Sequence, residues 1–183
     1  MKVFKLFIVM ILFFSFEKAH SQMIKSELNT EKTDFKEIRI EDIAQVFFTK
    51  GSENSIIVER SSDKDKEIQF SITDGIASVK AVHSTEESKK NNYNLYITSK
   101  SDDIFINAYN LGIVQTTDKA QFGTIKLKVI NAGKIDLTVD TQTLVLNIEN
   151  VASLKISGKT DQLTLDKKNV MLSNLRKLKV KKD

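Results

Sequence analysis

The C-terminal part of the chain repeats itself with a fixed period, and this repeat constrains the fold more than any other feature. An apolar pair at alternating positions recurs every 19 residues, and an asparagine follows each pair at the same interval. A fainter copy precedes these units with an offset of 21 residues. The pairs are Ile104/Ile106, Ile125/Leu127, Leu144/Leu146 and Leu163/Leu165, and the asparagines are Asn110, Asn131, Asn150 and Asn169.

A period near 20 residues with alternating apolar positions is typical of β-strand turns stacked on one another. One strand cannot bury its apolar face alone, so the equivalent strand of the next turn lies beside it, about 4.8 Å away and parallel. The apolar pairs then form two core columns, Ile104-Ile125-Leu144-Leu163 and Ile106-Leu127-Leu146-Leu165. Because parallel crossovers are right-handed by strong preference, the sequence predicts a right-handed parallel β-helix with rungs of about 19 residues.

The asparagines form a third column in this arrangement. Stacked amides can hydrogen-bond along a column, and asparagine tolerates the tight bend between two faces of a coil. The alternative is a row of amides that binds a ligand. At a bend the structural role is favoured, so we interpret this set as a structural column.

The N-terminal half consists of shorter β-prone runs separated by turn signals. Residues 44–49 and 55–60 flank a turn cluster and predict one hairpin, and Asp74-Gly75 between residues 67–73 and 76–82 predicts a second with a tight turn. No segment has helical periodicity with caps. We therefore predict an all-β protein with a single domain over residues 35–183, in which hairpins occupy 35–103 and β-helix rungs occupy 104–180.

The first residues have the pattern of an export signal. Lys2 and Lys5 precede an apolar run, Leu6 to Phe16, that is too short for a transmembrane helix, and small residues follow at a cleavage site before Gln22. We predict a signal peptide over 1–21, with an uncleaved anchor as the alternative. Residues 22–34 are polar and unpatterned, which predicts a disordered linker.

No second long apolar segment follows, so no transmembrane segment is expected in the mature chain. The expected location is the periplasm, the outer-membrane surface or the extracellular space. Cysteine is absent, which excludes disulfides, thiolate metal sites and a cysteine nucleophile. The net basic charge lies in the signal segment and in residues 176–183. This tail could contact an acidic polymer or lipid headgroups, but we interpret it as a solvated terminus that keeps the last rung soluble, and we expect no nucleic-acid partner.

Parallel β-helices also include carbohydrate-active enzymes that use carboxylates, so we examined this alternative. The candidates are Asp136, Asp140 and Asp166, with Lys134 or Lys155. They follow the outward phase of ordinary solvated strands and have no aromatic platform among them. His83 is the single histidine after the signal peptide, and metal-ligand clusters and phosphate-binding loops are missing. The sequence therefore predicts no catalytic, cofactor-binding or metal-binding residues, and no cofactor.

Three aromatic residues lie where the hairpins meet the rungs: Phe105, Tyr109 and Phe122. They form either an exposed recognition patch for a protein or glycan partner or an aromatic plug that closes the end of the coil. The plug is favoured, because an uncapped end exposes both core and strand edge. A further alternative is a periplasmic protein that forms a homo-oligomer through an exposed strand edge.

The sequence also resembles a family of exported bacterial proteins, the putative auto-transporter adhesins with a head GIN domain. The resemblance is carried by the signal segment, by motifs in the N-terminal half and by the repeats themselves. The motifs are Phe35-Lys-Glu-Ile-Arg-Ile40, Val46-Phe-Phe-Thr-Lys-Gly51 before Ile56-Ile-Val58, Ile72-Thr-Asp-Gly-Ile76 and Tyr96-Ile-Thr98. The family favours small residues at each bend, which Asn131-Ala-Gly133 keeps and Asn169-Val-Met171 does not. The resemblance implies an exported, non-catalytic, adhesin-like β-helix of the cell envelope.

Overall fold

The computed structural model describes residues 24–28, 34–60, 68–82 and 93–181. Within these ranges the chain is all β, without a helix, so the all-β prediction is confirmed. The strands are β1 (Ile24–Leu28), β2 (Glu37–Glu41), β3 (Gln45–Lys50), β4 (Ser55–Arg60), β5 (Ile68–Thr73), β6 (Ile76–Ala81), β7 (Asn94–Ser99), β8 (Asp103–Thr116) and β9 (Ala120–Val180).

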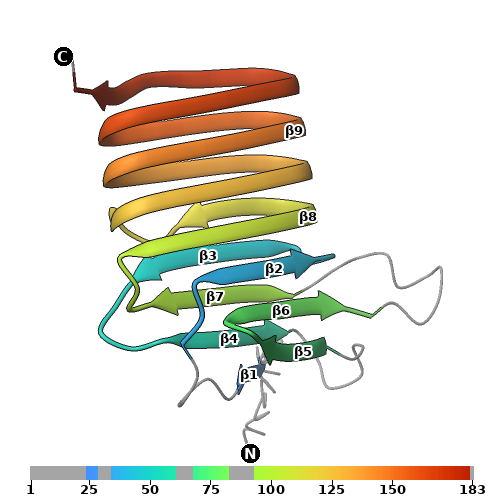
Figure 1. Ribbon diagram of the computed structural model, residues 1–183. Coiled ribbons are helices and arrows are strands. Elements are labelled where there is room, and N and C mark those ends of the chain that lie inside the picture. The colour runs from blue at the N-terminus through green and yellow to red at the C-terminus, as the bar shows by residue number, and fades with distance from the viewer. Residues whose placement is uncertain (1–23, 29–33, 61–67, 83–92, 182–183) are drawn as a thin grey trace, which may run out of the picture.

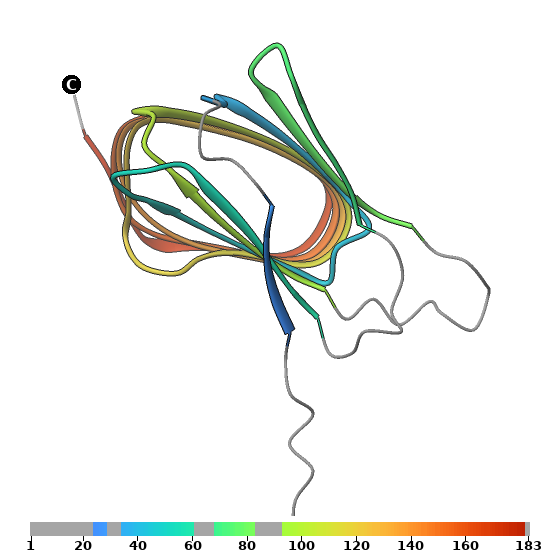
Figure 2. The ribbon, with the colours of Figure 1, turned by 90° about the horizontal axis from the view of Figure 1, so that it is seen from below.

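β9 is a single strand of 61 residues that winds into stacked turns (Figure 1). β8 pairs in parallel with the first of these turns, with Ile104 opposite Ile125 and Ile106 opposite Leu127. When the molecule is seen along the stack, the turns superpose in an elongated ring (Figure 2). This winding follows from the sequence period, because each turn brings the next apolar pair over the one before it.

The N-terminal strands extend the stack below β8 and do not form a separate set of hairpins. β2 lies parallel to the first half of β8, with Ile38 opposite Ile106, and β3 lies parallel to the second half, with Val46 opposite Val114. β6 then pairs in parallel with β2, and β7 with β3. The predicted division into hairpins over 35–103 and rungs over 104–180 is therefore wrong, since the apolar faces of these strands are buried in the same core as the repeats.

Of the two predicted hairpins, one forms. β5 and β6 pair antiparallel across Asp74 and Gly75, whose φ angles of 52° and 76° suit a tight turn. β3 and β4 do not pair with each other, because β7 lies between them in the sheet. That position buries Val46 and Phe48 completely, since β3 is then covered by a parallel neighbour on both sides.

β1 corrects the predicted linker. It lies within residues 22–34, for which the sequence predicted disorder, yet it pairs antiparallel with β4. Lys25 Nζ lies 3.3 Å from Glu59 Oε1, across this pair. The prediction missed the strand because its apolar residues, Ile24 and Leu28, are too few to give a pattern, and because β4 supplies an edge that only the fold creates. The predicted signal peptide, residues 1–21, lies outside the described residues.

The core runs through the centre of the stack from the lowest strands to the penultimate turn of β9. Of the predicted core columns, Ile104, Ile106, Ile125, Leu127, Leu144 and Leu146 are fully buried, and Leu163 and Leu165 are partly buried. The columns therefore lie where the period predicts, but the last turn is covered on one side only. No helix in the described ranges is long and apolar enough to cross a membrane.

Candidate functional site

The asparagine column lies at one bend of the coil and forms a continuous hydrogen-bonded ladder. All four asparagines have positive φ angles between 52° and 61°. Each Nδ2 donates to the side-chain oxygen of the residue one turn earlier, over 3.0 Å from Asn131 to Asn110, 3.0 Å from Asn150 to Asn131 and 2.9 Å from Asn169 to Asn150. These amides therefore bond to one another along the bend, in the arrangement expected of a structural column.

The ladder has a fifth member, Asp42, which sequence reasoning missed. Its φ angle is 59°, and its Oδ1 accepts a hydrogen bond of 3.2 Å from Asn110 Nδ2. The signal was present in the sequence, because Ile40-Glu-Asp-Ile-Ala44 matches Ile148-Glu-Asn-Val-Ala152. Aspartate shares with asparagine the tolerance for this backbone conformation, and an ionised carboxylate accepts but cannot donate, so Asp42 can only end the donor chain.

The structure separates the three aromatic residues at the junction. Phe122 is buried, with its ring centroid 6.5 Å from that of Phe48, and Lys50 Nζ lies 5.7 Å from its ring. Phe105 and Tyr109 lie four residues apart on the outer face of β8 and are partly exposed. Phe122 therefore has the position of a core plug, whereas the other two lie on a surface.

Tyr109 borders a groove of about 500 Å³ between the β5–β6 hairpin and β2, which we call the aromatic groove. Its lining includes Arg39, Glu41, Gln69, Ser71, Lys80 and Tyr109. Lys80 Nζ lies 2.9 Å from Glu41 Oε1, so an ion pair forms part of the groove's lining. An apolar and aromatic concavity with a few charged groups has the composition of a protein or ligand contact surface. The sequence could not place Lys80 and Glu41 beside Tyr109, because β6, β2 and β8 meet only through non-local pairing.

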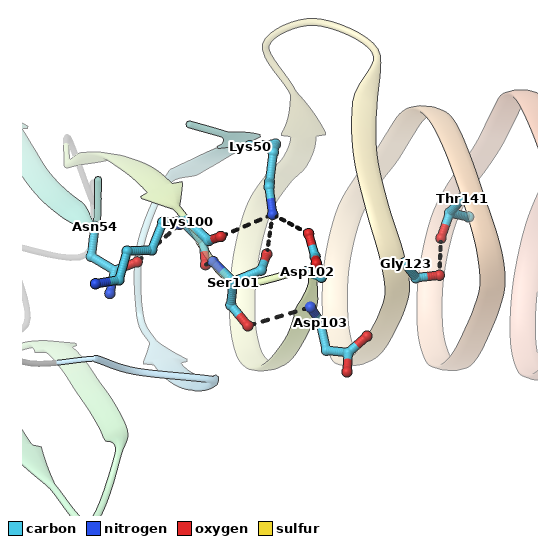
Figure 3. A network of polar contacts seen from close by, with 9 residues as sticks. Lys50, Asn54, Lys100, Ser101, Asp102, Asp103, Gly123 and Thr141 are labelled. Carbon is cyan, nitrogen blue, oxygen red and sulfur yellow. Dashed lines mark hydrogen bonds and ion pairs between the residues drawn. The ribbon is translucent and has the colours of Figure 1, made fainter. Parts of the chain in front are cut away.

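A second, polar groove of about 630 Å³ follows the other bend of the coil. Its polar lining includes Asp102, Asp103, Asp140, Gln142, Lys159 and Asp161, which come from successive turns. At this bend Thr141 Oγ1 donates a hydrogen bond of 2.9 Å to the carbonyl oxygen of Gly123, which links two successive turns (Figure 3). No group of three or more His, Asp or Glu side chains in the described ranges is placed to hold a metal ion.

At the edge of the polar groove, Lys50 ties β3 to the turn that enters β8 (Figure 3). Its Nζ donates to the carbonyl oxygens of Lys100 and Ser101, over 2.9 Å and 2.8 Å, and to Asp102 Oδ1 over 2.7 Å. The hydrogen bond from Lys50 lowers the pKa of Asp102 below its ordinary value. These contacts occupy all three N–H donors of the ammonium group. Lys50 therefore acts as a fastening, by which we mean that it links β3 to the turn before β8.

The carboxylates considered as catalytic candidates are held by lysines. Burial raises the pKa of Asp136, but the ammonium groups of Lys134 and Lys155, at 2.9 Å and 3.1 Å, bring it below its ordinary value overall. The hydrogen bond from Lys119 at 2.8 Å is the main cause that lowers the pKa of Asp140, with help from Lys159. A general acid at neutral pH needs a raised pKa, so neither carboxyl is tuned for that role.

The remaining candidates fall elsewhere. Asp166 lies exposed on the last turn, beside Lys168 in a shallow groove, and His83 lies outside the described residues. A buried carboxylate that the sequence did not single out is Glu59, which accepts from Asn94 Nδ2 at 3.1 Å and from Tyr96 OH at 2.8 Å. The hydrogen bond from Asn94 is the main cause that lowers the pKa of Glu59. These bonds, with Lys25, join β1, β4 and β7.

The described part of the chain is thus an all-β stack with an aromatic groove and a polar groove on its outside. Its sequence matches the family described as "Putative auto-transporter adhesin, head GIN domain" over residues 34–182. The match covers most of the chain, so the protein belongs to this family. No curated protein matches the chain.

Solved structures give remote matches. A putative adhesin from Parabacteroides merdae is 11% identical, with 86% of this chain and 98% of that chain covered and a TM-score of 0.39. A putative cell adhesion protein from Clostridium sporogenes is 8% identical, with 87% and 99% covered and a TM-score of 0.43. A putative lipid binding protein from Parabacteroides distasonis is 11% identical, with 86% and 98% covered and a TM-score of 0.37. Since all three scores are low, the assignment rests on the family match.

Proposed function

We propose that this protein is an exported, non-catalytic binding module of the bacterial cell envelope that adheres to a protein or glycan partner through the aromatic groove. The observation that carries the proposal is the position of the partly exposed Tyr109, with Arg39 and the Lys80–Glu41 ion pair, in a partly apolar concavity on the outside of the stack. Aromatic side chains with arginine beside them supply most of the binding energy at recognition surfaces. Membership of an adhesin family supports the same reading.

A rigid stack suits this role. We propose that the coil of β8 and β9 is a right-handed parallel β-helix, since right-handed crossovers pack best against twisted parallel strands. Every turn contacts only its neighbours, so the stack forms a long, flat scaffold that holds the groove at one end. The lowered pKa values of Asp136 and Asp140 argue against a general acid at either position, because a general acid must stay protonated at neutral pH.

The location is tested with protease on intact cells, followed by immunoblotting for the mature chain. We expect loss of the protein without permeabilisation, because an adhesin must reach the outside of the cell. Digestion that requires opening of the outer membrane would place the protein in the periplasm and would contradict adhesion to other cells. A cytoplasmic protein of the same cells, intact throughout, serves as the control for lysis.

Adhesion through the groove is tested with fluorescent beads that carry the purified mature chain, applied to neighbouring or host cells. We expect the double substitution Arg39→Ala with Tyr109→Ala to reduce bead adherence about tenfold or more, as loss of two central contacts does. Val145→Ala, on the outer face of β9 away from the groove, is the matched control and should adhere normally. Equal adherence of both variants and wild type would contradict the role of the groove.

A further inference from the structure

The two ends of the stack differ from its middle in how well the core is covered. Among the described residues, the apolar side chains that pack against the core yet stay partly exposed lie at these ends. At the upper end they are Leu163, Leu165, Val170, Leu175 and Leu178, all on the last turn of β9. At the lower end they are Leu28 on β1 and Ile68, Phe70 and Ile72 on β5.

The last turn also carries the exposed large apolar side chains of the described residues. Met171 is 82% exposed, Leu172 is 68% exposed and Val180 is 41% exposed. The backbone of this turn bonds to the turn below, for example from Lys181 N to Thr160 O over 3.0 Å, and no described strand lies above it (Figure 1). An unpaired edge beside exposed apolar side chains is a surface that readily accepts another strand.

The lower end has a matching edge. β1 and β5 are the two end strands in the order of the sheet, so each has one side without a described neighbour. In β5 the partly buried residues alternate with exposed polar ones, as in a strand half covered by a core. Within the described residues, both ends of the stack therefore have a strand edge without a neighbour and an incompletely buried apolar face.

Charge distinguishes the two ends. The last turn, residues 162–181, contains six Lys or Arg side chains and one Asp, whereas the end strands β1 and β5 carry one Lys and one Glu between them. Two upper ends would therefore repel each other, whereas an upper end meets no net positive charge on β1 and β5. Basic and acidic side chains already pair between adjacent turns, as Lys168 Nζ does with Glu149 Oε1 at 2.8 Å.

We propose that copies of this chain assemble head to tail, with the last turn of β9 in one copy docked on the end strands β1 and β5 of the next. The contact joins two different surfaces, so it does not close on itself and generates a filament that continues the stack. This inference goes beyond the proposed binding function. β5 borders both surfaces, but self-assembly is measured with the purified chain alone, without the partner that adhesion requires.

The first test is sedimentation velocity of the purified chain 22–183 over a range of concentrations, in low and in high salt. We expect the mean sedimentation coefficient to rise with concentration at both salt concentrations, because salt screens apolar contact and strand pairing little. Met171→Lys with Leu172→Lys adds two charges to the apolar upper end and should give a monomer. Gln142→Lys with Asn147→Lys adds the same charges at exposed sites in the middle of the stack and should leave assembly unchanged.

Mixing two variants, each blocked at a different end, distinguishes head-to-tail assembly from other modes of self-association. Ile72→Lys places a charge on the lower end and is expected to block it. If circular dichroism shows that this variant has lost β structure, Ser71→Lys, at an exposed site of the same strand, is used in its place. Each blocked variant alone should be monomeric, and a mixture of an upper-blocked and a lower-blocked chain should form a species of two chains. A wild-type chain that stays monomeric at all concentrations, a wild-type dimer that grows no further, or blocked variants that fail to combine would each overturn the proposal.

Discussion

At the residue scale, the recurring asparagine is explained by backbone conformation more than by side-chain chemistry. The bend requires a positive φ angle at Asp42 and at each stacked asparagine. A left-handed conformation costs most L-residues roughly 1–2 kcal/mol, while asparagine and aspartate adopt it because a short polar side chain can hydrogen-bond locally. The hydrogen bonds between the stacked side chains then link successive turns. The residue types allowed at the bend are still set by the positive φ angle.

Substitution of Asn150 separates these two contributions. Asn150→Ala loses the ladder bonds to Asn131 and Asn169 and also strains the backbone, so we expect unfolding free energy to fall by about 2 kcal/mol. Asn150→Gly loses the same bonds but accepts the φ angle of 54°, so we expect a loss of about 1 kcal/mol. Urea denaturation followed by circular dichroism measures both. Equal losses in the two variants would show that backbone strain has no part in the choice of asparagine.

Glu59 makes stability depend on pH. Hydrogen bonds, first that from Asn94, hold its folded-state pKa below the ordinary value of 4.5. A carboxyl with a depressed folded-state pKa stabilises the protein above its unfolded pKa, and this contribution is lost as the pH falls through the folded value. We therefore expect unfolding free energy to decrease below about pH 4.5, and to decrease less in Glu59→Gln. Thermal melts of both proteins from neutral to acidic pH measure the difference, and parallel curves would contradict it.

At the element scale, Lys50 fastens β3 to the start of β8. Lys50→Met keeps an aliphatic side chain near Phe122 but removes three hydrogen bonds, so we expect a loss of about 1–3 kcal/mol. The pKa of Asp102 should rise towards its ordinary value of 3.8, because Lys50 is the main cause that lowers it. Denaturation and an NMR titration of Asp102 measure the two effects.

A matched variant controls for the loss of a surface charge. Lys128→Met, on the exposed outer face of β9, removes one lysine far from this junction and should change neither stability nor the Asp102 titration. An Asp102 pKa that stays depressed in Lys50→Met would show that another group holds it, and would contradict the role of Lys50 as a fastening.

The elements also show what a sequence alone can predict here. The turns of β9 were predictable because each contacts the next at a constant 19-residue interval. The contribution of β2 and β3 to the same stack was harder to predict, since 68 residues separate Asp42 from Asn110 and break the period, which leaves the likeness of residues 40–44 to 148–152 as the signal. β3 and β4 flank a turn cluster that suits a hairpin, but β3 pairs with β7 and β8 instead, and the local sequence carries no signal of this distant pairing. The aromatic groove depends on these same non-local pairings and was therefore hidden.

At the scale of the whole molecule, the stack behaves as a nearly one-dimensional array in which each turn is stabilised by its neighbours. Turns in the middle have a neighbour above and below, and Ile125, Leu127, Leu144 and Leu146 are accordingly 0–1% exposed. The last turn has a described neighbour on one side only, and Leu163 and Leu165 are partly exposed. Its local stability is therefore expected to be the lowest in the coil.

Hydrogen–deuterium exchange of the purified chain tests this gradient. At low concentration we expect amides of residues 162–180 to exchange fastest within β9, and those of 125–156 slowest, because opening the last turn breaks one interface and opening a middle turn breaks two. Raising the concentration should slow exchange at 162–180, since docking on the lower end of another copy supplies the missing neighbour. Met171→Lys with Leu172→Lys should remove this concentration dependence while the gradient remains. Uniform exchange along β9 at all concentrations would contradict both the array description and the docking of the last turn.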